Sequence, residues 1–429
     1  MKLDIRIFRS AVIAAGIVGI MLGAGCAPPT NTDPNGGKAE SEVKDTTNPD
    51  ATAVVRPDPP VDGPAITGDT IKIGLVASQN GPLIPWGVDC INGVKLAVDL
   101  QNEKGGVDGK KIQLLVEDDA STPEGGKSAA EKLVSDGIIG LLGEVSSGIT
   151  QPMSQVSFEN GIPHIAVGAT KTTITDMGSN VFRVCYTDDF QGPVMAKFAY
   201  DQGLRNVAIM TDEKQPYSQY LSKTFKEFFT KLGGTIAAEQ SYESGQTTFT
   251  GQLSNIKSAN PDGLFLSGYF TEVGPIVKQA GQLGLSNVTY MGGDGWDSNQ
   301  LVKSGGDAIV GGFFCNHYNE HEKRKEVQDF LAAWKKKYGG KPGTTMGALG
   351  YDAAALMMDA IHRATTKDAK GIIEALDNTV DFKGVSGNIT LKGMHGNPKK
   401  PALVVEVTKD GFVPRKSYTY DEVFSAAKN

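Results

Sequence analysis

The chain contains 429 residues, of which 39% are hydrophobic and 21% are charged, and its formal net charge is −7. This length predicts two or three domains, and the apolar content excludes a chain that is disordered throughout. The acidic balance provides no basic surface of the kind that binds nucleic acid, so we expect no nucleic-acid partner.

The N-terminal segment has the features of an export signal. Lys2, Arg6 and Arg9 precede an apolar stretch that ends directly before Cys26. At about 15 residues, the stretch is shorter than the roughly 20 that span a bilayer. The pattern resembles a bacterial lipoprotein signal, although Gly23 departs from the usual residue three places before the cysteine; the alternative is an ordinary secretory signal. We expect residues 1–25 to be a signal peptide and Cys26 to carry a lipid that anchors an extracytoplasmic protein to a membrane.

A linker follows the predicted lipidation site. Positions 27–65 hold 8 of the 21 prolines of the chain and no Phe, Trp or Tyr. A segment of this composition cannot bury enough apolar surface to offset the entropy lost on ordering. We therefore expect residues 26–68 to be a disordered tether between the anchor and a folded body.

From residue 69 onward, short apolar runs alternate with longer amphipathic stretches. The predicted strands cover 71–76, 111–117, 138–143, 164–168, 207–210, 263–268 and 287–292. Apolar residues at helical spacing occupy stretches between them, such as 86–102 and 221–232. This alternation predicts parallel sheets covered by helices on both faces, and its restart near residue 207 predicts two α/β lobes.

The usual signatures of catalysis are missing from the sequence. Ser121 stands where a Walker A loop requires Gly, and there is neither a nucleophile elbow nor a dinucleotide-binding glycine motif. His317 and His321 have the spacing of two metal ligands on one helix face, but they lie in a charged run, and a solvated helix start is the preferred interpretation. We expect no catalytic residue, no cofactor and no metal site.

The loops after the predicted strands carry polar groups, and doubly wound sheets bind their ligands at this edge. In the first half, the loops 144–152 and 168–170 offer hydroxyls and backbone N–H groups next to helix starts, which suit a small anion. In the second half, the loops 212–217, 268–272 and 292–297 offer carboxylates and tyrosines, which suit a cation and an apolar body. Together the two sets predict a zwitterion held between two lobes.

Six segments taken together resemble one known family. They are IKIGLVASQNGP, NEKGGVDGKKIQLLVEDDAS, SSGITQP, GIPHIAVGAT, DDFQGP and YMGGDGWDS. In this order and spacing, over nearly all of 69–412, they resemble the branched-chain amino acid (Leu/Ile/Val-type) solute-binding proteins of ABC importers. The resemblance implies the type I periplasmic binding fold, with two doubly wound α/β lobes that have parallel sheets and are joined by a three-segment hinge.

The same resemblance implies how the chain is divided and how it moves. Lobe one would comprise 69–187 plus 319–396, and lobe two 188–318 plus 397–429. The chain would cross between them near 186–189, 316–319 and 396–402. Hinge closure would then trap the ligand between the lobes.

A set of positions matches the ligand-binding residues of the family. These are Trp86, Ser147, Gly168, Ala169, Thr170, Tyr217, Tyr269 and Asp294. The groups of lobe one would hold an α-carboxylate, and Asp294 would pair with an α-ammonium, where the best-known members carry Glu. The alternatives are core positions for the aromatic residues and helix capping for the two hydroxyls. Because Asp is one methylene shorter than Glu, the resemblance does not establish a Leu/Ile/Val substrate.

The resemblance leads to one functional interpretation and leaves alternatives open. We interpret the chain as an extracytoplasmic, lipid-anchored and monomeric binding protein that delivers an amino acid, branched-chain or related, to the permease subunits of an ABC importer. It would not be an enzyme. The alternatives are a receptor domain that senses a ligand, and a binding protein for an amide, a urea-like solute or an aromatic acid.

Three cysteines remain beyond Cys26. Cys90 shares a helical face with Val94, so we expect a buried free thiol there. Cys185 and Cys315 lie next to the first and second crossings, which run side by side in the implied fold. We predict a Cys185–Cys315 disulfide at the hinge, and the alternative is two unpaired small apolar residues.

Overall fold

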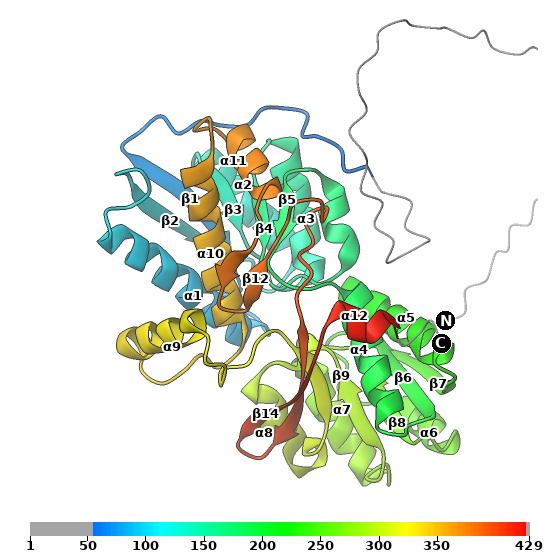
Figure 1. The fold of residues 1–429 in the computed structure, drawn as a ribbon. Coiled ribbons are helices and arrows are strands. Elements are labelled where there is room, and N and C mark those ends of the chain that lie inside the picture. Colours follow the sequence, from blue (N-terminus) through cyan, green and yellow to red (C-terminus); the bar gives the residue numbers. More distant parts are fainter. Residues whose placement is uncertain (1–54, 426–429) are drawn as a thin grey trace, which may run out of the picture. The chain divides into compact units, whose positions relative to one another are not determined.

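The computed structural model describes residues 55–425, shown in Figure 1. The predicted signal peptide, Cys26 and most of the predicted tether lie outside these residues. Within residues 55–425, no helix is both long enough and apolar enough to cross a bilayer.

Lobe one, as we use the name, is the five-stranded parallel sheet with the helices packed on it. The strand order is β2-β1-β3-β4-β5. The strands are β1 (Thr70–Val76), β2 (Lys111–Glu117), β3 (Gly140–Leu142), β4 (His164–Ala166) and β5 (Val181–Arg183). The helices are α1 (Ile84–Glu103), α2 (Pro123–Ser135), α3 (Ser147–Glu159), the short 3-10 helix η1 (Thr172–Met177), α9 (Lys325–Tyr338), α10 (Met346–Arg363) and α11 (Ala369–Asp377), followed by the hairpin of β11 (Phe382–Gly384) and β12 (Gly387–Ile389).

Lobe two is the seven-stranded sheet with its helices, in the strand order β14-β13-β10-β9-β8-β6-β7. The strands are β6 (Asn206–Asp212), β7 (Thr235–Tyr242), β8 (Gly263–Leu266), β9 (Thr289–Gly292), β10 (Phe313–Asn316), β13 (Ala402–Thr408) and β14 (Gly411–Tyr418). The helices are α4 (Asp188–Asp201), α5 (Pro216–Lys231), α6 (Thr250–Ser258), α7 (Phe270–Gln282), α8 (Asn299–Gly305) and α12 (Tyr420–Ser425), with the 3-10 turns η2 (Asp294–Trp296) and η3 (Gly306–Ile309).

The fold class predicted from the sequence is confirmed, with one difference at the edge of lobe two. Strands β6 to β10 are parallel to one another, but β13 pairs antiparallel with both β10 and β14. The register places Leu403, near the start of β13, opposite Asn316 at the end of β10. The chain therefore enters the sheet at the end where β10 leaves it, without the helical crossover that a parallel partner requires.

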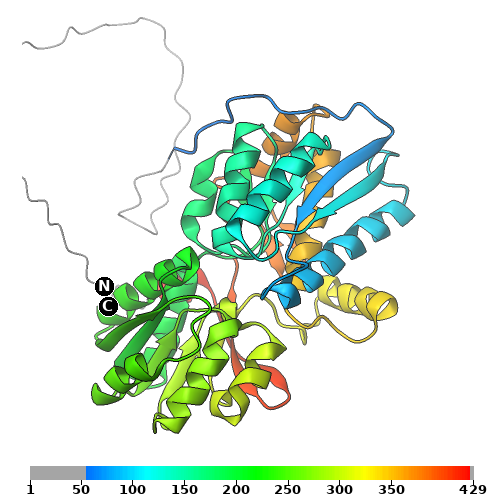
Figure 2. The same cartoon turned by 180° about the vertical axis from the view of Figure 1, so that it is seen from behind.

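The chain passes between the two sheets three times. The passages lie between β5 and α4, between β10 and α9, and between β12 and β13. Figures 1 and 2 show these segments side by side between the two sheets. Because β strands in both lobes point their carboxyl ends toward this region, the loops that follow them face one another across the gap between the lobes.

The end of the predicted tether packs on lobe one. Arg56 donates hydrogen bonds to the carbonyl oxygens of Thr175 (3.0 Å), Gly178 (2.7 Å) and Val181 (2.5 Å), and Ile66 N donates to Lys367 O (2.8 Å). The prediction of disorder up to residue 68 is therefore wrong for 56–66. The composition of the segment could not predict this contact, because the Arg56 guanidinium donates to carbonyl groups that lie more than a hundred residues away in the sequence.

The predicted disulfide is wrong, because Cys185 and Cys315 are both free and buried. The Cys185 thiol donates to Ala169 O at 3.4 Å, within lobe one. Cys315 instead lies beside the Tyr186 hydroxyl. Tyr186, in the first passage, therefore occupies the position next to Cys315 that the prediction gave to the Cys185 sulfur. Cys90 is a buried free thiol, as predicted.

Candidate functional site

A small cavity lies between the loops of the two lobes, with about 210 Å³ of empty space. It is lined by Trp86, Val145, Ser147, Gly168, Thr170, Tyr217, Tyr269, Asp294, Gly295 and Met346. The structure therefore brings seven of the eight ligand-binding candidates around one cavity. Ala169 is the exception, because it does not line the cavity and its carbonyl accepts hydrogen bonds from Arg183 and Cys185.

Lobe one contributes hydroxyls and the start of a helix. Ser147 is the first residue of α3, and its Oγ accepts a hydrogen bond from Lys171 N at 3.2 Å rather than capping the helix. Thr170 Oγ1 is buried beside the Asp188 carboxyl and has no hydrogen bond of good geometry within the described chain. A helix N-terminus together with a hydroxyl suits the oxygens of an anion.

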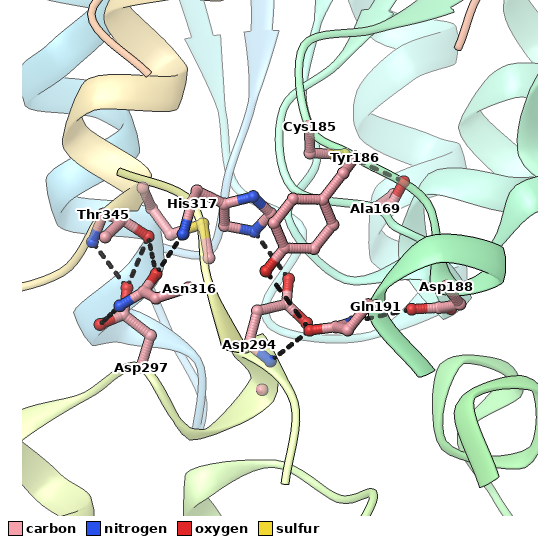
Figure 3. Close-up of polar contacts among 12 residues, drawn as sticks. Ala169, Cys185, Tyr186, Asp188, Gln191, Asp294, Asp297, Asn316, His317 and Thr345 are labelled. Carbon is pink, nitrogen blue, oxygen red and sulfur yellow. Dashed lines mark hydrogen bonds and ion pairs between the residues drawn. The ribbon is translucent and has the colours of Figure 1, made fainter. Parts of the chain in front are cut away.

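Lobe two contributes a carboxylate with one free oxygen. Asp294 opens the 3-10 turn η2 that follows β9, and its side chain is 5% exposed. Its Oδ2 accepts a hydrogen bond from His317 Nε2 at 2.8 Å, and its backbone N–H donates to Gln191 Oε1 at 2.7 Å (Figure 3). Its Oδ1 is buried and has no partner among residues 55–425. A buried carboxylate oxygen without a partner is costly, so this atom is suited to receive a donor from a ligand.

His317 lies in the second passage and not at a solvated helix start, so that interpretation is wrong for it. Its ring is buried and stacks on Tyr186 with 4.1 Å between centroids, and α9 begins only at Lys325. His321 is exposed, and no group of three metal-binding side chains occurs in the described part of the chain. The imidazole instead orients Asp294, because its Nε2–H occupies one carboxylate oxygen and leaves the other free.

Aromatic side chains form the wall between the two polar ends. Trp86 meets Tyr269 edge-on at 5.0 Å, and Tyr269 stacks on Tyr217 at 5.3 Å. Tyr217 Oη accepts a hydrogen bond from Gly295 N, and burial raises the pKa of Tyr217 well above its usual value. The hydroxyl therefore remains neutral and keeps its own proton available for donation.

One acidic side chain, Asp294, lines the cavity. Among residues 55–425, no Lys or Arg lines it. The carboxyl of Asp188 lies close by, and its pKa is raised well above the usual value by burial and by Asp294. The buried Asp188 carboxyl is therefore neutral, and Asp294 is the acidic side chain in the lining toward which a ligand could bring a positive charge.

Comparisons with known proteins identify the family of the chain. A model of the periplasmic binding protein family matches residues 70–411. The Leu/Ile/Val-binding protein BraC3 of Rhizobium johnstonii is 32% identical over 324 residues, which are 75% of this chain and 87% of that protein. The leucine-binding protein LivK of Thermotoga maritima has a similar crystal structure, with a TM-score of 0.78, 32% identity, and coverage of 82% of this chain and all of that chain.

The chain belongs to the branched-chain amino acid binding protein family. The family resemblance drawn from the six sequence segments is thereby confirmed. Members of this family are periplasmic solute-binding proteins of ABC transporters and not enzymes.

Solved relatives differ in the ligands that they hold. The branched-chain amino acid binding protein LivJ of Streptococcus pneumoniae, in complex with isoleucine, has a TM-score of 0.75 at 27% identity and covers 82% of this chain and 99% of its own. A solute-binding protein of Rhodopseudomonas palustris, in complex with 3,4-dihydroxybenzoic acid, has a TM-score of 0.73 at 25% identity and covers 82% of this chain and 98% of its own. Fold and family alone therefore do not fix the ligand.

Several residues of the site escaped the sequence analysis. Val145, Gly295 and Met346 line the cavity, and Gln191 and His317 hold Asp294. Val145 and Gly295 stand inside loops that were singled out, so inspection of each whole loop would have included them. Met346 opens α10 and follows no strand, and His317 follows β10, a strand that the sequence analysis did not predict.

Proposed function

We propose that this family member is the lipid-anchored receptor of an ABC importer and captures an α-amino acid between its two lobes. The observation that carries the proposal is the free Oδ1 of Asp294 across a small cavity from the Thr170 hydroxyl and the start of α3. An α-ammonium at the first site and an α-carboxylate at the second would satisfy both ends of the cavity.

The side chain of the ligand is apolar and small in this proposal. Trp86, Val145 and Met346 supply apolar surface, and none of the described residues that line the cavity is a Lys or Arg that could pair with an acidic side chain. The cavity is small, so it suits a compact side chain. Relatives whose names specify leucine, isoleucine or valine support an aliphatic ligand of this class.

Lipid anchoring rests on the sequence before Cys26. The apolar run and the small residues at its end match a signal after which a cysteine is acylated, and a monomer tethered in this way would stay beside its permease. Metabolic labelling with palmitate in a bacterial host tests the anchor: the parent should incorporate label, and Cys26→Ser should not. Equal labelling of the two proteins would contradict it.

The ligand class is tested by a thermal-shift screen. The panel contains L-leucine, L-isoleucine, L-valine, L-phenylalanine, L-glutamate and 3,4-dihydroxybenzoate. A ligand at about 100 times its Kd adds about 2.7 kcal/mol to the free energy of unfolding, so we expect the aliphatic amino acids to raise the melting temperature most. A shift with 3,4-dihydroxybenzoate and with no amino acid would contradict the proposal.

The second candidate is a binding protein for an aromatic acid. The dihydroxybenzoate complex of a relative and the aromatic wall of Trp86, Tyr217 and Tyr269 favour it. The free oxygen of Asp294 opposes it, because an aromatic acid without an ammonium group would leave this buried acceptor without a donor.

A further inference from the structure

Asp297 links the two lobes through its side chain. It lies directly after the η2 turn of lobe two and is 1% exposed. Its Oδ2 accepts hydrogen bonds from Thr345 N at 2.6 Å and from Thr345 Oγ1 at 2.7 Å, and Thr345 precedes α10 of lobe one (Figure 3). Its Oδ1 accepts a hydrogen bond from Asn316 Nδ2 at 3.2 Å. Both carboxylate oxygens are therefore in use, and one of them bonds across the gap between the lobes.

The backbone of the same residue makes a second link. Asp297 O accepts a hydrogen bond from the indole Nε1–H of Trp86 at 2.7 Å. Trp86 stands in the first turn of α1 in lobe one, and its ring lines the cavity. One residue of lobe two thus accepts three hydrogen bonds from two separate helix starts of lobe one.

These links are mechanically connected to the cavity. Asp294 begins the single turn of η2 and Asp297 follows it. Two neighbouring residues each hold one of these acids: Asn316 at the end of β10 and His317 in the second passage. Asn316 Oδ1 also accepts a hydrogen bond from Thr345 Oγ1 at 2.9 Å. A ligand that fixes Asp294 therefore fixes the turn that presents Asp297 to Thr345.

We propose that Asp297 is the latch of the closed state, a positioning residue that holds lobe one over the bound solute and sets how fast the solute leaves. Separation of the lobes breaks the bonds to Thr345 and Trp86 and returns the carboxylate to water. Burial in the closed arrangement raises the pKa of Asp297 to about 6, as expected for a carboxylate taken out of water. The latch acts on the lobes and does not contact the ligand, so it goes beyond the proposed amino-acid function.

Hydrogen exchange at the tryptophan indoles tests the latch without knowledge of the ligand. The Trp86 indole N–H bonds across the gap, whereas the Trp296 indole N–H donates to Leu266 O within lobe two and serves as an internal control. Thr345→Val removes one latch donor. Its matched control is Thr344→Val, because Thr344 contacts Asp89 and Met346 within lobe one.

We expect Thr345→Val to accelerate exchange at Trp86 about tenfold, since a hydrogen bond to a charged group contributes enough for such a factor. Exchange at Trp296 should not change, and Thr344→Val should affect neither indole. Equal exchange at Trp86 in the parent and in Thr345→Val would overturn the latch. Trp86 exchange at the rate of free indole in the parent, without ligand and with L-leucine, would also overturn it, because the bond to Asp297 would not form in solution.

Stopped-flow fluorescence with L-leucine as the probe measures the consequence for release. We expect Thr345→Val to raise the dissociation rate constant about tenfold with an association rate constant within about threefold of the parent. Thr345→Ser, which retains the hydroxyl, should restore slow release. If Thr345→Val lowered the melting temperature but released L-leucine at the rate of the parent, Thr345 would have a structural role and the latch would be contradicted. Absence of any L-leucine binding to the parent would contradict the amino-acid proposal, whereas the exchange experiment would still decide the latch.

Discussion

At the scale of single residues, one carboxylate oxygen of Asp294 bonds to the protein and the other is available to a ligand in the cavity. His317 occupies Oδ2 through a 2.8 Å hydrogen bond, and Oδ1 stays free. His317→Phe preserves the stacking on Tyr186 but removes the donor, so we expect it to weaken L-leucine binding about tenfold, the factor that corresponds to one hydrogen bond to a charged group. His317→Gln, which can present an N–H near the position of Nε2, should bind within about threefold of the parent.

Calorimetric titration of both variants at pH 7.5 provides the measurement. Equal affinities of His317→Phe and the parent would show that the imidazole does not position the carboxylate. The sequence indicated Asp294 because acidic residues after a strand stand at the binding edge of a parallel sheet. It did not indicate His317 as the partner of Asp294, because the 22 residues between the two positions contain a helix, a 3-10 turn and a strand, and only folding brings the two side chains together.

At the scale of elements, His164 joins three segments of lobe one. It lies in β4, its Nε2 donates to Gly143 O after β3 at 2.6 Å, and its Nδ1 faces Ser154 Oγ of α3 at 3.3 Å. Burial lowers the pKa of His164 to about 4, whereas an exposed histidine titrates near 6.5. The unfolded chain therefore binds a proton more readily than the folded one, and the contribution of the neutral ring to the free energy of unfolding falls as the pH drops from 6.5 to 4.

His164→Gln removes this titration. Between pH 7 and pH 5 we expect the stability advantage of the parent over the variant to narrow by about 2 kcal/mol, because each pKa unit corresponds to about 1.4 kcal/mol. Urea unfolding at the two pH values measures both proteins, and the comparison cancels the titration of the other groups. A constant difference between the parent and the variant would contradict the buried neutral ring.

Strand and helix patterns predicted the elements better than their pairing. Apolar runs such as 71–76 and 207–210 identified β1 and β6, because strands buried on both faces are continuously apolar. The antiparallel strands β13 and β14 were not predicted. Most residues of β14 are exposed or half-buried, whereas β13 is a buried apolar run whose antiparallel pairing breaks the strand–helix alternation. The contacts of Arg56 and the free thiols of Cys185 and Cys315 also depend on distant segments, which local patterns do not report.

At the scale of the whole molecule, the two sheets bring loops from opposite halves of the chain around one cavity. Seven of the eight residues carried over by family resemblance line it, because the ends of parallel strands place these loops whatever the sequence of the helices between them. The role of each residue toward a ligand remains our proposal. The central claim of the proposed function is that Asp294 binds the ammonium group of an amino acid.

Calorimetric titration of L-leucine into the parent and into Asp294→Asn tests this claim most directly. Breaking one side of a buried charge pair costs about 2–5 kcal/mol, and each 1.4 kcal/mol is tenfold in affinity. We therefore predict that Asp294→Asn, with an unchanged melting temperature in the absence of ligand, binds L-leucine at least about thirtyfold more weakly than the parent. Binding of L-leucine with equal affinity by the two proteins would contradict the account and favour a ligand that lacks the ammonium group.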